Sequence, residues 1–551
     1  MDRTVEVGWD READIVVVGS GGAGLAAALT AASLGATVEL LEKADSVGGT
    51  TAVSGGVIWV PAHDREPDLD LPVEDALAYL RAQSLGQMDD VLVGTFVRRA
   101  PEAMRYLEAH SPLRLAVAEG FPDYKPELPG GKPGGGRSLR SVPFDLTALD
   151  GWADSVTSFP ADWSNVGFDA ETRARYSSED DVPPDGRVVV GGAALVAALL
   201  RGLLDMGVEP QVSARVVELV EVDGAIVGVV VSAGGRDERV RARRGVILAS
   251  GGFEWDAGLV RAFLRGPMRG PVSPPLNTGD GLRMAMQQGA ALGNMGEAWW
   301  VPVVQIPGDE FGGHQRSRSI RLERTRPRSI VVNRLGRRFM NEAGDYNSMG
   351  GPFHVLDPVH GYVNDPGWLV FDHEHLVKYG SFGYHAGERL PDWMHASDSL
   401  QDLAVKIGVE PNGLLRTVEE WNAQAVAGAD PQFGRGSSAY DGWWGDRSAP
   451  TTAGQTLGPL ESAPFYAVRL TIGSMGTKGG PQTDEHGRVQ RIDGGPLPGL
   501  YAAGNVMAGV TGKAYGGAGG TIGPGLTWGY IAAMDALRGD DAGRRVDETI
   551  R

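Results

Sequence analysis

Two residues near the C-terminus have the types and spacing needed to polarise a carbonyl group. Tyr515 supplies a phenol that can donate a hydrogen bond, and Gly519, four positions later, supplies a backbone N–H that no side chain encumbers. The surrounding segment, residues 512–525, contains only Lys513 as a cation and no His or Arg. Because a dicarboxylate needs a clamp of cationic groups, this segment favours a ketone over a dicarboxylate.

A second constellation, near the N-terminus, has the pattern of a dinucleotide site. Gly19, Gly21 and Gly24 form G-x-G-x-x-G. The first glycine permits a tight turn, the second lets the backbone approach a pyrophosphate, and the third allows close packing of helix on strand. Glu42 follows at the distance at which an acidic residue accepts hydrogen bonds from a ribose.

The elements around these glycines are the ones that a dinucleotide site requires. The sequence predicts a buried strand over residues 15–18, an Ala-rich helix over 25–34 and a second strand over 37–42. The helix N-terminus would then offer N–H groups to the phosphates. A further small-residue loop, 48–56, lies where an extended cofactor continues past its pyrophosphate. Gly191-Gly192 lacks the third glycine of a second fingerprint, so separate FAD and NAD(P) domains are disfavoured.

The rest of the chain alternates between helical and strand patterns. We expect helices over 73–109, 188–204 and 521–537, a Gly/Pro-rich loop over 122–143, strands over 214–222 and 225–232 that turn at Asp223-Gly224, and a strand within 245–254.

Composition excludes several classes of protein. The 551 residues contain no cysteine, which excludes disulfides, Cys-held zinc and iron–sulfur clusters ligated by this chain. A formal net charge of −19 disfavours nucleic acid and anionic membranes as partners. No apolar stretch reaches the ~20 residues that span a bilayer, so we expect no transmembrane segment and a cytoplasmic location. With 81 glycines and 42% apolar residues, the glycines must lie in ordered turns and close contacts.

Nearly end to end, the chain resembles the flavoprotein family that contains fumarate reductases and 3-ketosteroid dehydrogenases, within the fumarate reductase and succinate dehydrogenase superfamily. The motifs that carry the resemblance are the N-terminal unit, the loop GG-T-T-A-x-S-GG at 48–56, Ala249-Ser250-Gly251-Gly252, Thr278-Gly279-Asp280-Gly281, and P-G-L-Y-A-A-G-N at 498–505. The resemblance implies that the N-terminal unit binds FAD. It also implies that the helix beginning near Thr521 points its N-terminus at the flavin N1/O2 edge, where negative charge collects on reduction.

The predicted cofactor-binding residues follow from these motifs and from the resemblance. They are Gly19, Gly21, Gly22, Ala23, Gly24, Glu42, Lys43, Gly48, Gly49, Thr50, Thr51, Ser54, Gly55, Gly56, Val216, Ala249, Ser250, Gly251, Asp280, Gly504, Asn505, Gly520, Thr521 and Ile522. No metal site is expected, because the histidines of residues 354–385 show no metal-binding spacing.

Three tyrosines and one glycine match the catalytic set of 3-ketosteroid Δ1-dehydrogenases. Tyr124 in Phe121-Pro122-Asp123-Tyr124 and Tyr346 in Asn341-Glu342-Ala343-Gly344-Asp345-Tyr346 stand in contexts similar to that family's tyrosines. Tyr515 and Gly519 share the four-residue spacing of its third tyrosine and glycine. The resemblance implies that Tyr515 and Gly519 hydrogen-bond a ketone oxygen, Tyr346 takes the α-proton with support from Tyr124, and the β-hydride passes to flavin N5.

Two residues depart from that family's pattern, and both bear on the choice of substrate. Gly516 stands where Pro is common, which should loosen the loop that presents Tyr515. Asp345, if close, would raise the pKa of the Tyr346 phenol. The alternatives are an FAD-dependent desaturase or ene-reductase of a smaller cyclic ketone or enone, and a non-catalytic flavin-binding protein. We expect an external electron acceptor, with a quinone as the candidate, and the oligomeric state is left open.

The fold class implied is α/β, a Rossmann-like FAD-binding domain with an inserted α+β catalytic domain. We place the FAD-binding domain at residues 1–305 and 478–551, and the inserted domain at 306–477. The active site would lie in the cleft between them. We expect Trp299-Trp300 and Trp443-Trp444 to be core or interface residues. The charged run from Arg316 to Arg328 is predicted to be a solvated surface.

Overall fold

The chain begins with the strand–helix–strand unit that its glycine pattern predicts. In the computed structural model, which describes residues 8–66, 68–157 and 187–538, β1 (Arg11–Val18) leads into α1 (Gly22–Ser33) and then β2 (Val38–Leu41). β1 pairs in parallel with β2 and with β10 (Arg236–Leu248). Its apolar residues are buried, as the uninterrupted run of apolar residues predicts for a strand covered on both faces.

Distant parts of the chain complete this first sheet. β10 pairs in parallel with β24 (Pro496–Ala502), and β24 pairs with β23 (Arg488–Gln490), so the order is β2-β1-β10-β24-β23. The predicted hairpin is β8 (Ala214–Val222) and β9 (Ala225–Ala233), and β9 pairs with β10. Asp223 and Gly224 both have positive φ, 51° and 80°, as a two-residue type I′ turn requires.

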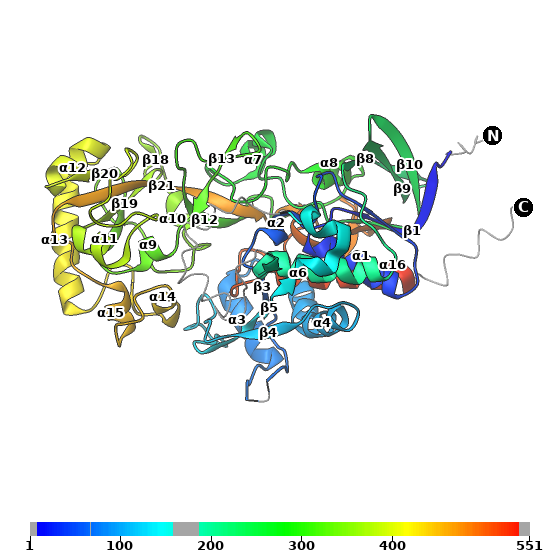
Figure 1. Ribbon diagram of the computed structural model, residues 1–551, viewed down its shortest axis with the longest axis horizontal. Helices are drawn as coiled ribbons and strands as arrows, with labels where there is room; N and C mark the ends of the chain where they lie inside the picture. The colour runs from blue at the N-terminus through cyan, green and yellow to red at the C-terminus, as the bar shows by residue number, and fades with distance from the viewer. Residues whose placement is uncertain (1–7, 67, 158–186, 539–551) are drawn as a thin grey trace, which may run out of the picture.

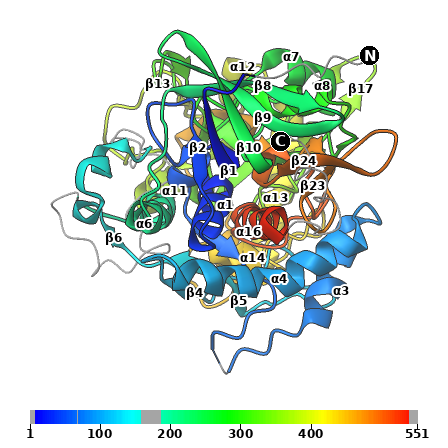
Figure 2. The same cartoon turned by 90° about the vertical axis from the view of Figure 1, so that its right-hand side faces the viewer.

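Helices cover the face of this sheet opposite the hairpin. α1 packs against α16 (Ile522–Arg538) and α6 (Gly191–Asp205), with α4 (Asp90–Ala109) below α16 and α3 (Val73–Ser84) beside α4 (Figure 2). The backbones of α1 and α16 approach closely, because a Cβ on Gly529 would lie 2.3 Å from the Ala23 carbonyl oxygen. The C-terminal helix therefore becomes part of the N-terminal unit.

Two segments predicted as loops contain regular structure. The loop 48–56 includes the short helix α2 (Gly49–Ala52), and the stretch 122–143 includes β5 (Gly135–Ser141). β5 lies between β3 (Val57–Trp59) and β4 (Leu115–Glu119) in a three-stranded antiparallel sheet. The loop prediction was wrong for β5 because pairing with two distant strands outweighs its local composition.

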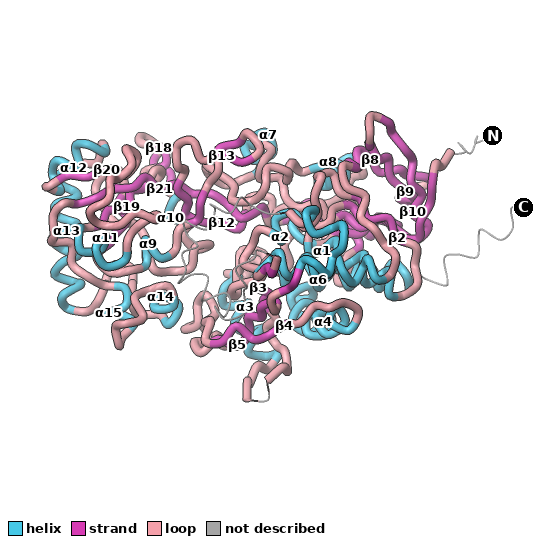
Figure 3. The backbone as a smooth tube through the Cα atoms, in the orientation of Figure 1, coloured by secondary structure: helices cyan, strands magenta, loops and turns pink. Residues whose placement is uncertain are grey.

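A second large sheet forms the other end of the elongated molecule (Figure 1). It is antiparallel, in the order β15 (Arg318–Ser319), β12 (Ala298–Val304), β21 (Phe465–Thr477), β19 (Gly367–Phe371) and β16 (Ser329–Val332), with β20 (His395–Ser397) also on β21. α11 (His373–Tyr379), α12 (Leu400–Ile407) and α13 (Pro411–Ala427) lie at the far end (Figure 3). The boundaries at residues 306 and 477 stay a prediction.

The shorter elements connect these sheets. They are β6 (Phe144–Asp145), η1 (Leu146–Ser155), β7 (Val188–Val189), α7 (Ala257–Phe263), α8 (Asp280–Gln287), β11 (Leu292–Gly293), β13 (Glu310–Phe311), β14 (His314–Gln315), α9 (Leu322–Thr325), α10 (Gly350–Phe353), β17 (Leu356–Asp357), β18 (Gly361–Tyr362), α14 (Ala439–Trp443), α15 (Thr452–Thr456), β22 (Gly480–Pro481) and η4 (Gly504–Val506). Among residues 8–66, 68–157 and 187–538, no helix combines the length and apolar composition needed to cross a membrane.

The charged run from Arg316 to Arg328 is largely buried, so the prediction of a solvated surface was wrong. Arg316, Arg318, Arg321, Arg324 and Arg326 are each at most 8% exposed. Arg316 and Arg318 bind the Asp309 carboxylate, and Arg324 binds backbone carbonyls. These partners come from the fold, and a reading of local charge does not reveal them.

Candidate active site

One cavity runs from the glycine turn after β1 to a group of buried tyrosines. Most of the predicted cofactor-binding residues line it: Gly19, Gly21, Gly22, Ala23, Glu42, Lys43, Gly49, Thr50, Thr51, Ser54, Gly55, Gly56, Val216, Ala249, Ser250, Gly251, Asp280, Gly504, Asn505, Thr521 and Ile522. Tyr124, Tyr346, Tyr515 and Gly519 line the same cavity. The structure therefore brings the predicted cofactor and catalytic residues into one continuous space.

Three predicted glycines lie behind the cavity wall. A Cβ on Gly24 would lie 1.9 Å from the Gly19 carbonyl oxygen, and one on Gly48 would lie 2.8 Å from the Val196 side chain. A Cβ on Gly520 would lie 2.8 Å from the Tyr515 ring. These three glycines do not line the cavity, but they allow the close packing that shapes its wall.

The acidic residue at the end of β2 is held firmly in the wall. Glu42 Oε2 accepts hydrogen bonds from the Ser20 backbone N–H (2.9 Å) and hydroxyl (2.7 Å), and Oε1 accepts from the Ala44 N–H (2.9 Å). These bonds fix the carboxylate beside the glycine turn. A carboxylate has about four acceptor sites, so capacity for ribose hydroxyls is left.

A small ion cluster stands at the same end of the cavity. Lys43 Nζ lies 3.0 Å and Arg215 Nη2 2.9 Å from the Asp280 carboxylate. Burial raises the pKa of Asp280, but the bonds from Arg215 and Lys43 outweigh burial and hold this pKa below its usual value. Arg215 was not predicted from the sequence.

The polar groups of this part of the cavity fit FAD. The N-cap residue of α1, Gly21, provides no side-chain cap, and Thr51 Oγ1 accepts only from the Gly22 N–H (3.1 Å), so the N–H groups of Ala23 and Gly24 are available to phosphate oxygens. The Ser250 hydroxyl is buried and has no hydrogen-bond partner among the residues that the structure describes. Free helix amides, an orphaned hydroxyl and a fixed carboxylate that line one cavity are the donor and acceptor set that a dinucleotide requires.

The fingerprint gives a direct prediction for cofactor content. In Gly24→Ala, the new methyl group meets the Gly19 carbonyl oxygen, so α1 must move away from the glycine turn. We expect purified protein with at least tenfold less bound FAD, measured as the ratio of flavin to protein absorbance. Gly35→Ala is the matched control, because a Cβ there meets nothing within 4 Å, although its positive φ adds some strain. Full FAD content in Gly24→Ala would contradict the assignment.

The three predicted tyrosines meet at the other end of the cavity. The Tyr124 and Tyr346 hydroxyls are 2.6 Å apart, and the Tyr346 and Tyr515 hydroxyls are 3.1 Å apart. The Thr521 hydroxyl donates to the Tyr515 oxygen at 3.2 Å. Tyr124 comes from the stretch before β5, Tyr346 from the loop before α10, and Tyr515 from the loop before α16. Residues separated by hundreds of positions therefore form one chain of phenols.

Burial strongly affects the acidity of these phenols. It raises the pKa of Tyr346 and of Tyr124 well above the usual value, and the neighbouring phenols add to the rise. The Arg321 guanidinium lies 5.3 Å from the centre of the Tyr346 ring and opposes the rise at Tyr346. Arg321 lines the cavity and was not predicted from the sequence. The Asp345 carboxylate, which precedes Tyr346 in the chain, accepts its hydrogen bonds from the Ser348 N–H and hydroxyl.

Gly519 can only be glycine. Its φ is +91°, and a Cβ would lie 2.4 Å from the Val57 carbonyl oxygen and 2.5 Å from the Trp59 nitrogen. Its N–H has no hydrogen-bond partner among the residues that the structure describes. The strand β3 thus packs against Gly519, whose free amide belongs to the same cavity lining as the three tyrosines.

The loop that presents Tyr515 is fixed, although Gly516 was expected to loosen it. The Gly516 carbonyl accepts from the Tyr79 hydroxyl (2.7 Å) and the Tyr124 N–H (3.0 Å), and the Tyr515 N–H donates to Gln83 (3.0 Å). A Cβ on Gly516 would lie 2.4 Å from the Trp59 ring. Packing against Trp59 therefore supplies the rigidity that a proline would give.

A buried lysine, also missed in the sequence, supports this loop. Lys478 Nζ is within 3.1–3.4 Å of the carbonyls of Gly512, Lys513 and Ala514 and lies 4.1 Å from the Trp299 ring centre. Burial lowers its pKa to about 7. Trp299 packs on Tyr515, with ring centres 4.6 Å apart, and donates to Asn505 Oδ1. No spacing in the sequence marks a lysine for this role.

Comparison with known proteins identifies the family. The chain matches the FAD binding domain family over residues 14–522. It is 38% identical to the 4-oxocyclohexanecarboxylate 2-dehydrogenase of Sinomonas cyclohexanicum, covering 96% of this chain and 93% of that protein. It is 37% identical to the 3-oxosteroid 1-dehydrogenase of Mycolicibacterium smegmatis, covering 97% and 99%. The crystal structure of 3-ketosteroid Δ1-dehydrogenase from Sterolibacterium denitrificans with 1,4-androstadiene-3,17-dione superimposes with a TM-score of 0.86 at 32% identity, covering 96% and 100%.

The chain therefore belongs to the FAD-binding flavoprotein family that includes the 3-oxosteroid 1-dehydrogenases. The predicted family, the FAD cofactor and the α/β flavoprotein fold are confirmed. The protein is an FAD-dependent oxidoreductase of the kind that acts on CH–CH groups. The roles of the individual tyrosines stay a prediction.

Proposed function

We propose that this protein desaturates a carbon–carbon bond next to a ketone, and that its best-supported reaction is Δ1-desaturation of a 3-ketosteroid. The observation that carries the proposal is the chain of three hydrogen-bonded phenols, which lines one cavity with Gly519 and with the predicted FAD-binding residues. The similarity to 3-oxosteroid 1-dehydrogenases over nearly the whole chain supports it.

In the proposed reaction, Tyr515 and Gly519 act first. Both donate hydrogen bonds to the ketone oxygen, which stabilises the enolate-like charge that develops as the α-proton leaves. Tyr515 is oriented for this role, because its oxygen already accepts from Thr521. Tyr346 takes the α-proton, and Tyr124 hydrogen-bonds to Tyr346 and stabilises the phenolate. Bound FAD supplies the acceptor for the hydride of the β-carbon.

A smaller cyclic ketone that carries a carboxylate is the second candidate substrate. Arg321, a buried cation, lines the cavity with the three tyrosines. A guanidinium recognises carboxylates, whereas the rings of a neutral steroid offer it nothing. The similarity to a 4-oxocyclohexanecarboxylate 2-dehydrogenase supports the same candidate.

Anaerobic mixing with a panel of ketones tests both candidates. The expected result is loss of the oxidised flavin absorbance with androst-4-ene-3,17-dione. 4-Oxocyclohexanecarboxylate and its methyl ester form a matched pair that differs in charge. Bleaching by the acid, with little by the ester or the steroid, would establish the second candidate. If an enone reoxidises the reduced protein and no ketone bleaches the oxidised protein, the protein is an ene-reductase. If no member of the panel reacts in either direction, the proposal is contradicted and a flavin-binding protein remains.

The proposal also predicts how the reaction depends on pH. Because burial raises the pKa of Tyr346, the phenol is protonated near neutral pH, and the phenolate fraction grows about tenfold per pH unit below that pKa. We expect the rate of flavin reduction at saturating ketone to rise several-fold or more for each unit between about pH 7 and pH 9. Tyr346→Phe should lose this rise. A flat wild-type profile over this range would exclude the phenolate as the base.

Two further proposals concern partners and location. Reoxidation of the reduced flavin requires an external acceptor, and a quinone is our first candidate. The cytoplasmic location stays a prediction.

A further inference from the structure

Arg324 is a fully buried cation that the proposed reaction does not use. Its relative exposure is 0%, and its hydrogen bonds go to backbone carbonyl oxygens: Nε to Ile320 (3.0 Å) and Nη1 to Glu342 and Gly344 (3.1 Å for Gly344). Its Nη2 has no hydrogen-bond partner among the described residues. This guanidinium therefore joins two separate stretches of backbone.

Each of those two stretches carries a residue of the active site. Ile320 immediately precedes Arg321, the guanidinium that lies over the Tyr346 ring. Gly344 lies two residues before Tyr346 itself, in a loop that has turns and no helix or strand. Arg324 consequently fixes the backbone that supplies the predicted base and the backbone that supplies the cation beside it.

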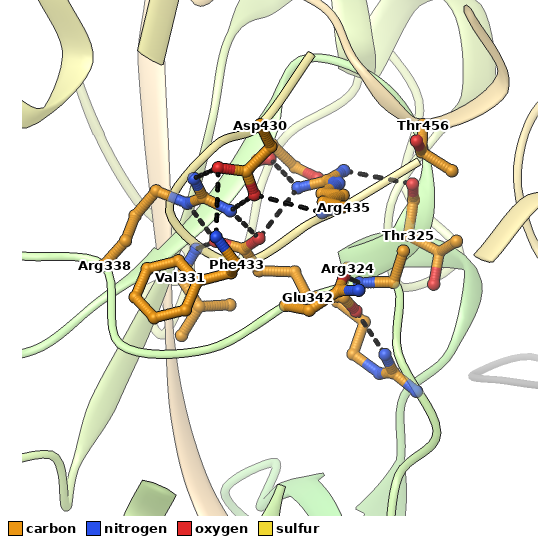
Figure 4. Close-up of polar contacts among 12 residues, drawn as sticks. Arg324, Thr325, Val331, Arg338, Glu342, Asp430, Phe433, Arg435 and Thr456 are labelled. Carbon is orange, nitrogen blue, oxygen red and sulfur yellow. Dashed lines mark hydrogen bonds and ion pairs between the residues drawn. The ribbon is translucent and has the colours of Figure 1, made fainter. Parts of the chain in front are cut away.

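A buried ion network holds the other side of the same loop (Figure 4). Glu342 accepts two hydrogen bonds from Arg338 (2.8 and 2.6 Å), one from the Val331 N–H (3.1 Å) and one from Arg435 (3.3 Å). Arg338 also binds both oxygens of Asp430 (3.0 and 2.9 Å). The side chain of Glu342 is thereby anchored, and its own carbonyl accepts from Arg324.

The energetics argue that Arg324 contributes position more than stability. Burial lowers its pKa to about 10, and no carboxylate within residues 8–66, 68–157 and 187–538 bonds to it directly. A buried charge compensated only by neutral carbonyls costs desolvation energy that an apolar side chain of similar volume would avoid. In exchange for this desolvation energy, the rigid guanidinium fixes the positions of three backbone carbonyls.

We propose that Arg324 is a positioning residue for catalysis, which sets the location of the Tyr346 hydroxyl relative to the Tyr515 hydroxyl and to the bound ketone. This inference rests on the proposed function, because it assigns Arg324 to the step in which Tyr346 takes a proton. Arg324 reaches the Ile320 carbonyl through Nε and the loop carbonyls through Nη1, and the single nitrogen of a lysine cannot stand at both of these positions. Arg324→Lys therefore keeps the charge and loses the geometry.

A double-mutant cycle with Tyr346 tests the proposal. The rate of flavin reduction per bound FAD is measured for wild type, Arg324→Lys, Tyr346→Phe and the double variant. We expect Arg324→Lys to lower the limiting rate about 10- to 100-fold with KM changed less than threefold, as misplacement of a reacting group does. In the Tyr346→Phe background, the same change should lower the residual rate less than threefold. An equal loss in both backgrounds would overturn the proposal.

Arg316→Lys is the control for loss of a buried guanidinium. Arg316 is 6% exposed and binds Asp309 Oδ1 (2.7 Å), a residue outside the Tyr346 loop. We expect it to lower thermal stability as Arg324→Lys does, with a much smaller loss of limiting rate. Equal rate losses in the two variants would also overturn the proposal. If none of the ketones reduces the flavin of the wild-type protein, the proposed function itself fails, and this outcome is distinct from failure of the Arg324 proposal.

Discussion

Replacing Tyr346 by Phe is expected to slow flavin reduction by ketone about 10³-fold while leaving bound FAD unchanged. The variant removes the oxygen that takes the α-proton, and general-base catalysis of this kind contributes about 10²- to 10⁴-fold. The Tyr346 hydroxyl stands between those of Tyr124 and Tyr515, so no other phenol can replace it without moving. Anaerobic stopped-flow measurement of flavin absorbance gives the rate.

Tyr440→Phe is the control for this experiment. Tyr440 is buried in the same aromatic cluster, with its ring centre 5.0 Å from that of Tyr124. Its hydroxyl has no side-chain partner in the chain of phenols, and it does not line the cavity. We expect its rate to stay within a few-fold of wild type. If Tyr346→Phe retained the wild-type rate, another group would be the base.

Replacing Tyr515 by Phe is expected to lower the limiting rate of flavin reduction about 10²- to 10³-fold. Removing one hydrogen-bond donor to a developing oxyanion has effects of this size, since the bond strengthens as charge appears on the ketone oxygen. The Gly519 N–H remains in the variant and retains part of the stabilisation. Single-turnover rates over a range of ketone concentrations separate the limiting rate from ketone binding.

Thr521→Val provides the comparison for Tyr515. It removes the hydrogen bond to the Tyr515 oxygen and keeps the phenol, so we expect a smaller loss than in Tyr515→Phe. A Tyr515→Phe variant that bound ketone more weakly but kept its limiting rate would contradict the proposed role. In that case, the phenol would only bind the substrate.

Local patterns predicted the elements whose structure depends on local rules. The unit around Gly19 and the hairpin at Asp223-Gly224 follow from strand burial and from turns that need positive φ. β5 was missed, because its strand conformation is set by pairing with β3 and β4. The charged run at Arg316 was misjudged because local charge does not show that the fold buries these arginines.

The candidate site was predictable in its residues and not in its geometry. Tyr124, Tyr346 and Tyr515 were identified by their motif contexts, yet only the fold shows their hydroxyls 2.6 and 3.1 Å apart. Arg321 and Lys478 carry no motif, and their importance arises from burial beside these tyrosines. Sequence alone could not show which charges the fold places around a phenol.

The most direct test of the central claim is a crystal structure of the protein with FAD and a bound unsaturated ketone product. We predict that the ketone oxygen lies within hydrogen-bond distance of both the Tyr515 hydroxyl and the Gly519 nitrogen, with the Tyr346 hydroxyl next to the former α-carbon. A ketone oxygen held by other groups, with the three phenols out of reach of the ligand, would contradict the account.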